Sequence, residues 1–251
     1  MGGPGRPPPA DPDQEYHRRD PDNNLALNRI RPRGRAGSFL VIVIGESRRI
    51  DLPCLVFGAP RPRGEDVNEA AKAMSTDLFY PAPDGLPVPV RPPRGSEEIR
   101  RVIQESNWAE LLKLADDSLV KTGALWLHGF LEEAHLLAQA NTSAEGSYWH
   151  ALVHRSEGDF ENSLYWYRRV GKHPIFSRLR GEVESVGGEG DDPGLMQELL
   201  AEPVWNPRRM VDLCRKTSVG ELTPGSLLQR VAAIEFNLLM GKILESRFFA
   251  S

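Results

Sequence analysis

The segment Ser147–Pro174, with the sequence SYWHALVHRSEGDFENSLYWYRRVGKHP, decides the fold predicted for this chain. Its apolar residues recur at helical spacing on both sides of a central Gly158-Asp159 pair. Gly158 can adopt the left-handed backbone that ends a helix, and Asp159 can accept hydrogen bonds from the first free amides of the next one. Pro174 ends the second helix because it has no amide hydrogen to donate. We therefore predict two helices folded back on each other around a tight turn.

The order of residues in this segment resembles a tetratricopeptide repeat, a helix–turn–helix unit of about 34 residues. The shared pattern is Gly-Asp-aromatic, a small residue at Ser163, then Tyr167, Val170 and a closing proline. The interval from Val170 to Pro174 is one residue shorter than in that repeat, and no second copy follows at a fixed period. Because a solenoid needs about three repeats to bury its faces, we predict one tetratricopeptide-like hairpin inside a compact helical domain.

A second resemblance covers more of the chain. The segment WHALVHRSEGDFENSLYWYRRVGKHP (149–174) is similar to one in a family of uncharacterised bacterial proteins. Two later segments, WNPRRMVDLCRK (205–216) and LLQRVAAIEFNLLM (227–240), look like the remaining landmarks of that family. The similarity extends over roughly residues 96–251. It implies a helical fold and assigns no reaction.

Length, charge and cysteine content narrow the classes of protein to which the chain can belong. Its 251 residues carry a formal net charge of −4, whereas a general nucleic-acid binder usually has a basic surplus. Cys54 and Cys214 are too few and too far apart for a disulfide framework or a zinc site, so a cytoplasmic location is predicted. No apolar run approaches the ~20 residues of a membrane helix. Neither nucleic acid nor membrane is therefore an expected partner.

Proline separates an N-terminal region from a helical one, because most of the 21 prolines lie before residue 96. Residues 1–37 mix proline, glycine, arginine and aspartate without periodicity and are predicted to be disordered. Residues 38–60 contain two apolar, β-rich runs and are predicted to form a β-hairpin. Met74, which opens MSTDLFYPAPDG, is an alternative to Met1 as the start of translation.

The remainder divides into a Pro-rich linker, residues 61–95, and an all-α domain, residues 96–251. Within the domain, Asn107 opens a helix that Gly123 is expected to break. The next helix is expected over residues 125–140. Later helices are predicted to start at Asn-Pro and Thr-Pro pairs, since proline is tolerated at the first helical position.

His150 and His154 are the foremost candidates for chemistry in the sequence. Their i, i+4 spacing places both imidazoles on one face of a helix, where they could share a metal ion or act as a general base. A third ligand could come from His128 or His135 on the preceding helix, and Glu157 is close in sequence. The alternative is structural: both histidines hydrogen-bond to backbone or carboxylate groups and hold the hairpin to its neighbour.

A second group of candidates lies on the second helix of the hairpin. Tyr165, Trp166, Arg168 and Arg169 are candidates for contact with a protein or peptide partner. Trp166 is expected to point away from the main apolar stripe, into a second packing layer or a partner surface. The alternative assigns the aromatic residues to the core and the arginines to a solvated edge.

The function predicted from the sequence is a helical scaffold or protein-interaction module that uses no cofactor. The alternative is a protein or enzyme that binds a divalent metal through His150 and His154. No phosphate-loop or nucleophile-elbow motif favours a particular reaction. An acidic residue within ligand reach of both histidines would favour the metal, whereas backbone hydrogen bonds to buried histidines would favour the scaffold.

Overall fold

The computed structural model describes residues 78–79, 86, 92–187, 192–223 and 225–245. These residues form ten α-helices and, within that part of the chain, no strand, which confirms the all-α prediction. The predictions of disorder for residues 1–37 and of a β-hairpin for 38–60 lie outside the described residues. Among the described helices, none combines the length and hydropathy that crossing a membrane requires.

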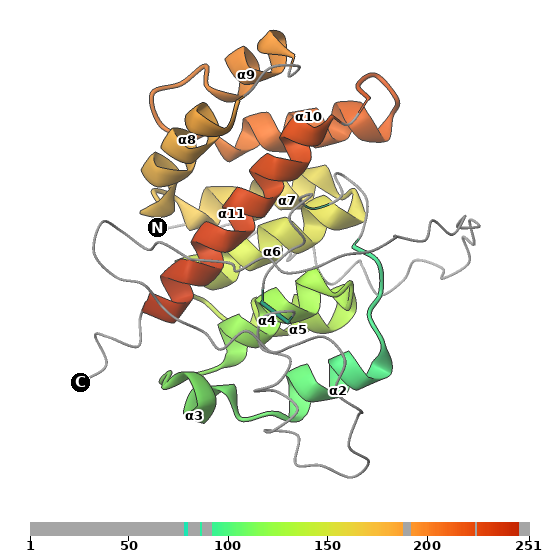
Figure 1. Ribbon diagram of the computed structural model, residues 1–251, viewed down its shortest axis with the longest axis vertical. Coiled ribbons are helices and arrows are strands. Elements are labelled where there is room, and N and C mark those ends of the chain that lie inside the picture. The colour runs from blue at the N-terminus through green and yellow to red at the C-terminus, as the bar shows by residue number, and fades with distance from the viewer. Residues whose placement is uncertain (1–77, 80–85, 87–91, 188–191, 224, 246–251) are drawn as a thin grey trace, which may run out of the picture. The chain divides into compact units, whose positions relative to one another are not determined.

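The helices follow one another with short connections (Figure 1). Their order is α2 (Glu97–Glu105), α3 (Trp108–Leu112), α4 (Ser118–Leu127), α5 (Leu131–Ala140), α6 (Ala144–Glu157), α7 (Phe160–Val170), α8 (Ile175–Val186), α9 (Pro193–Leu199), α10 (Pro207–Ser218) and α11 (Ser226–Glu245). Several begin after a residue whose side chain accepts a hydrogen bond from a first-turn amide, as the capping preferences predict. These caps are Ser96, Asn107, Ser143, Asp159, Asp192 and Asn206.

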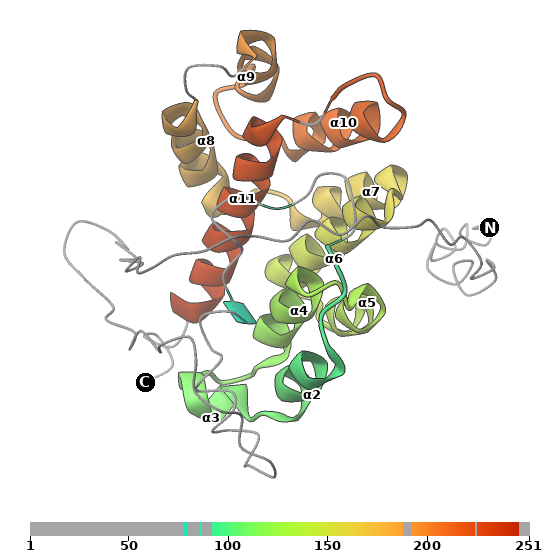
Figure 2. The same cartoon turned by 45° about the vertical axis from the view of Figure 1, so that its right-hand side comes forward.

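Helices α6 and α7 form the helical hairpin that the sequence predicts, and they lie side by side in both ribbon views (Figures 1 and 2). Gly158 ends α6 in the left-handed conformation, with a φ of 79°. The side chain of Asp159 then caps α7 by accepting from the amide of Asn162 at 3.3 Å. Ser163 allows the two helices to approach closely, and its hydroxyl donates to the carbonyl oxygen of Ala151 at 2.8 Å.

Gly123 does not break a helix, contrary to the prediction. It lies buried in the middle of α4, where a Cβ atom would clash with the side chain of Met240 and lie 2.7 Å from Cζ2 of Trp149. Glycine is therefore needed here for close packing of α4 against α6 and α11. The break falls instead at Gly129, whose φ of 71° separates α4 from α5.

The packed core extends beyond the boundary predicted at residue 96. Leu78, Phe79 and Leu86 belong to the segment predicted as a linker, yet all three are buried. Phe79 packs edge-on against Trp108, with ring centroids 4.8 Å apart. The hydrophobic core thus includes residues from the Pro-rich segment.

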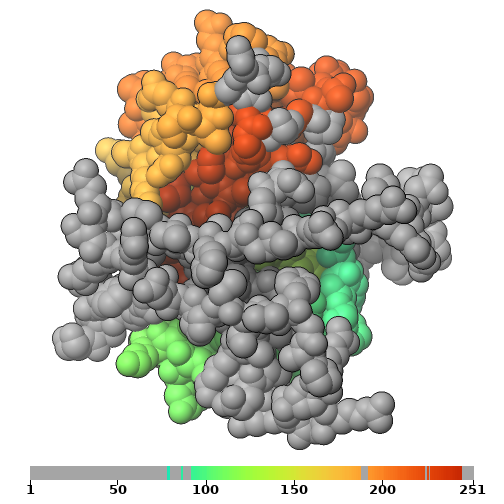
Figure 3. All heavy atoms as spheres, viewed as in Figure 1, coloured from blue at the N-terminus to red at the C-terminus, as the bar shows by residue number. Residues whose placement is uncertain are grey.

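The last helix connects the two ends of the domain. Helix α11 packs against α4 and against α8, and α10 packs against α7. Figure 2 shows α11 running from the α8–α10 end of the domain past α6 and α4. In the space-filling view, atoms of α8, α9, α10 and α11 lie together at the top (Figure 3). The candidate site described next is formed by α5 and α6.

Candidate metal centre

Three histidines from two helices converge in the protein interior. One imidazole nitrogen from each of His135, His150 and His154 lies within 4.8 Å of the other two. His135 is on α5, whereas His150 and His154 are on α6. The exposed fraction is 9% for His135 and 0% for the other two. The three rings therefore form one buried cluster.

The geometry of the cluster follows from helix periodicity and from the packing of α5 on α6. His150 and His154 are one helical turn apart, and their rings stack with centroids 4.8 Å apart and an angle of 14° between planes. His135 meets both rings edge-on, at centroid distances of 4.5 Å to His150 and 5.0 Å to His154. The pair on α6 is as the sequence predicts, and α5 supplies the third member.

The ligand type in this cluster suits a metal ion. A neutral imidazole keeps one nitrogen with a lone pair, and histidine is the commonest metal ligand in proteins. Burial also removes the competition from bulk water. Chemically, the arrangement suits a transition-metal ion.

Glu157 places a buried carboxylate beside the cluster. Its side chain is 5% exposed, and Oε2 lies 3.5 Å from Nδ1 of His154. Neither carboxylate oxygen accepts a hydrogen bond from a residue in the described part of the chain. A carboxylate next to one ring nitrogen commonly orients a metal-bound histidine and leaves the other nitrogen for the metal. Glu157 therefore lies beside His154 without a hydrogen bond to it.

Trp166 covers one side of the cluster. Its indole stacks on His150 with ring centroids 3.9 Å apart and 20° between planes. The guanidinium of Arg169 lies over the same indole, 5.0 Å from its ring centre. Trp166 is half-buried, so its indole packs on His150 while part of the residue remains at the surface.

The other candidate residues lie outside the cluster. His128 follows the last residue of α4 and is half-buried, so His135 is the preceding histidine that joins the pair. Arg168 is exposed, with its guanidinium 5.8 Å from the ring centre of Tyr165. Arg169 is also exposed, and its Nη1 donates to the hydroxyl of Tyr165 at 3.4 Å. The two arginines therefore lie at the exposed edge of α7, and Tyr165 is half-buried beside them.

No protein-family model matches the chain, and no match was found among curated proteins or solved structures. The resemblances to tetratricopeptide repeats and to an uncharacterised bacterial family therefore stay predictions. The function has to be inferred from the site itself.

Proposed function

We propose that this protein binds one divalent transition-metal ion through His135, His150 and His154, and that the ion fastens α5 to α6 within a helical scaffold. The observation that carries the proposal is the convergence of three buried imidazole nitrogens within 4.8 Å of one another. The carboxylate of Glu157 beside His154 supports it, because such a neighbour is common next to metal-bound histidines.

The three histidine side chains must move to bring their nitrogens to metal-binding distance. Zinc–nitrogen bonds are about 2.0–2.1 Å long, so two nitrogens on one tetrahedral ion lie roughly 3.4 Å apart. Nitrogens separated by as much as 4.8 Å must then approach each other by about 1.4 Å at most. His150 and His154 must also rotate out of their near-parallel stack, because a metal ion lies close to the plane of each imidazole ring that binds it.

The ligand set favours one class of metal. Imidazole nitrogen suits zinc, copper, iron and nickel, whereas magnesium and calcium prefer oxygen ligands. Complete burial of His150 and His154 favours a structural ion over one that acts on an external substrate, because catalytic zinc sites keep an open position. Zinc in a stabilising role is therefore the leading assignment.

The alternative, a scaffold that binds a protein or peptide without a metal, uses the same helices. Among its proposed contact residues, Trp166 is already stacked on His150 and is less available to an external partner. Tyr165, Arg168 and Arg169 remain at the surface of α7. They are the residues through which a partner would meet the hairpin.

Elemental analysis of the purified full chain by plasma mass spectrometry tests the metal proposal. We expect near-stoichiometric zinc, iron, copper or nickel in the parent protein. A His150→Ala/His154→Ala double variant and a His135→Ala variant should both lose it. The matched control is His128→Ala, which alters a histidine outside the cluster and should keep the metal.

Cobalt titration provides a second readout that does not depend on the metal acquired during expression. Apoprotein should develop the visible absorption of tetrahedral cobalt, and a folded His135→Gln variant should not. Equal metal content in the parent and every histidine variant, together with no cobalt spectrum, would overturn the proposal. The three histidines would then be structural members of the core.

A further inference from the structure

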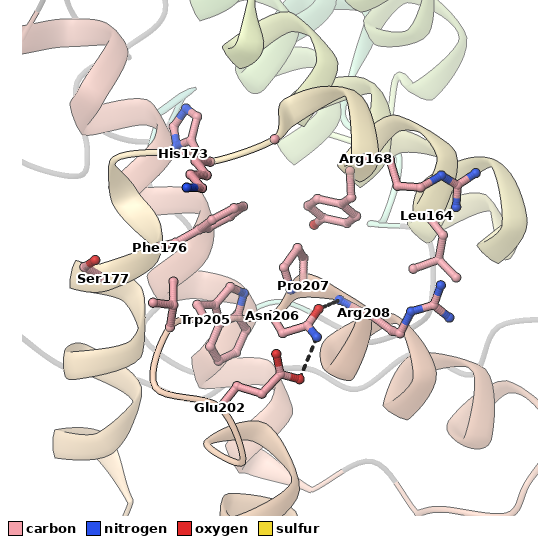
Figure 4. Close-up of a pocket in the computed structure, with 14 residues that line it drawn as sticks. Leu164, Arg168, His173, Phe176, Ser177, Glu202, Trp205, Asn206, Pro207 and Arg208 are labelled. Atoms are coloured by element: carbon pink, nitrogen blue, oxygen red, sulfur yellow. Dashed lines mark hydrogen bonds between the residues drawn. The ribbon is translucent and has the colours of Figure 1, made fainter.

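A surface pocket of about 620 Å³ lies between α7, α8 and the start of α10, away from the metal centre. None of the three clustered histidines lines it, nor does Glu157. Figure 4 shows Phe176 and Pro207 pointing into the pocket, with Arg168 and Arg208 at one edge. Pockets that hold small molecules usually measure about 300–1,000 Å³. This pocket is large enough for a small molecule that contains an aromatic ring.

The pocket carries an excess of positive charge. Arg168, Lys172 and Arg208 line it and are exposed, and the carboxylate of Glu161 interacts electrostatically with both arginines. The acidic side chain in the lining, Glu202, is already engaged. Its Oε1 lies 3.3 Å from Nη2 of Arg209 and accepts from the side-chain amide of Asn206 at 2.7 Å. The lining therefore carries more positive than negative charge, and an anionic ligand would compete with Glu161 for the two arginines.

The start of α10 adds to this charge. Asn206 caps the helix, and the pocket wall includes this residue and the two that follow it. The N-terminus of a helix carries a partial positive charge and attracts anions. Helix α10 has 12 residues, and the positive end of its dipole lies at the pocket. It therefore attracts an anion, as the exposed arginines do.

Trp205 supplies an aromatic ring to the pocket wall. Its side chain lines the pocket and the residue is only 3% exposed. Within the described part of the chain, no acceptor meets its indole nitrogen Nε1. Because this nitrogen is itself buried, Trp205 contributes the apolar part of its ring to the pocket.

From these observations we infer that the pocket binds a small organic anion, consisting of a ring-sized apolar body and one oxyanion group. The apolar body packs against Phe176, Trp205 and Pro207. The oxyanion, a carboxylate or a phosphate, meets Arg168 and Arg208 at the edge of the pocket (Figure 4). This site is separate from the metal centre and does not depend on it.

Isothermal titration of the full chain with matched probes tests this inference. The probes are 2-naphthoate, 2-naphthyl phosphate and the neutral 2-naphthamide. We expect at least one anion to bind about tenfold more tightly than the amide, because charge-assisted hydrogen bonds to arginine are strong. The relative affinity of the two anions distinguishes a carboxylate ligand from a phosphate.

Variants assign the binding to the pocket. An Arg168→Gln/Arg208→Gln double variant should weaken the anion about tenfold and leave the affinity for the neutral amide unchanged. The control is Arg178→Gln on α8. Arg178 lies outside the pocket, 3.7 Å from Glu182, so this variant should leave the affinity for the anion unchanged.

Three results would overturn the inference: no heat with any probe, equal affinity for the anions and the amide, or an arginine double variant that binds like the parent. Circular dichroism confirms that each variant is folded before titration. A folded His150→Ala/His154→Ala variant should still bind the anion normally. This outcome separates failure of the pocket from failure of the metal centre.

Discussion

The guanidinium of Arg155 on α6 lies 2.7 Å from the carboxylate of Glu235 on α11, and neither side chain is more than 5% exposed. Two hydroxyl groups complete the arrangement. Tyr148 donates to Oε1 of Glu235 at 2.8 Å, and Tyr167 on α7 donates to the same oxygen at 3.0 Å. Burial and the nearby carboxylate raise the pKa of both tyrosines well above the usual value, so both remain donors. The cluster ties α6, α7 and α11 together.

Removal of one partner of this ion pair should destabilise the protein strongly. Arg155→Met should lower the free energy of unfolding by about 3–5 kcal/mol, because it leaves the carboxylate of Glu235 buried without its cation. Urea unfolding followed by circular dichroism measures the change. The matched variant is Arg155→Met/Glu235→Gln, which removes both charges and keeps an acceptor for the tyrosine hydroxyls. It should recover much of the loss, and equal losses in the two variants would contradict this account.

Zinc should stabilise the folded chain if the histidine cluster binds it. An ion that binds only the folded state adds about 2.7 kcal/mol when its free concentration is 100 times the dissociation constant. Thermal unfolding of apoprotein at several zinc concentrations should therefore show a rising midpoint. His128→Ala should respond like the parent, whereas His150→Ala/His154→Ala should not respond. A shift of the same size in that double variant would place the zinc elsewhere.

Two glycine substitutions should have opposite effects on stability. Gly123→Ala should destabilise by about 1–3 kcal/mol, because the added methyl group overpacks the contact with Trp149 and Met240. Gly181→Ala, in the exposed face of α8, meets no atom within 4 Å and should stabilise by about 0.5–1 kcal/mol through helix propensity. Chemical denaturation of the two variants side by side tests both signs.

The thiol of Cys214 should be unreactive in the folded protein. Burial raises its pKa to about 11, so very little thiolate is present near pH 8, and the residue is fully buried. In a Cys54→Ser background, a thiol-specific reagent should label Cys214 slowly in buffer and completely in denaturant. Fast labelling of the native protein would show that this part of α10 opens to solvent.

The hairpin could be predicted because its turn and its helices depend on residues that are close in the sequence. Features that depend on distant residues could not be predicted in this way. The Gly158-Asp159 turn and the spacing of His150 and His154 depend only on nearby residues, and both predictions agree with the structure. The choice between His128 and His135 depended on where the helix after α4 begins. The sequence placed the break at Gly123, whereas packing keeps that glycine helical and the chain turns at Gly129.

Contacts between residues far apart in the chain could not be predicted from the sequence. Tyr148 and Glu235 are 87 residues apart, and a single glutamate in an apolar helix gives no indication of its partner. The pocket is similar, since Arg168 and Arg208 come together only when α7 packs against α10. The sequence identifies Arg168 as a candidate surface contact, but it does not indicate that Arg208 lies beside the same pocket.

The position of the histidine cluster in the chain bears on the order in which the protein folds. All three histidines lie between residues 135 and 154, on consecutive helices joined by a short connection. Closing so short a loop costs little chain entropy, whereas joining α6 to α11 must wait until distant segments meet. A metal ion could therefore be captured by the α5–α6 pair before the Arg155–Glu235 contact forms, and the ion would then nucleate the domain as well as stabilise it.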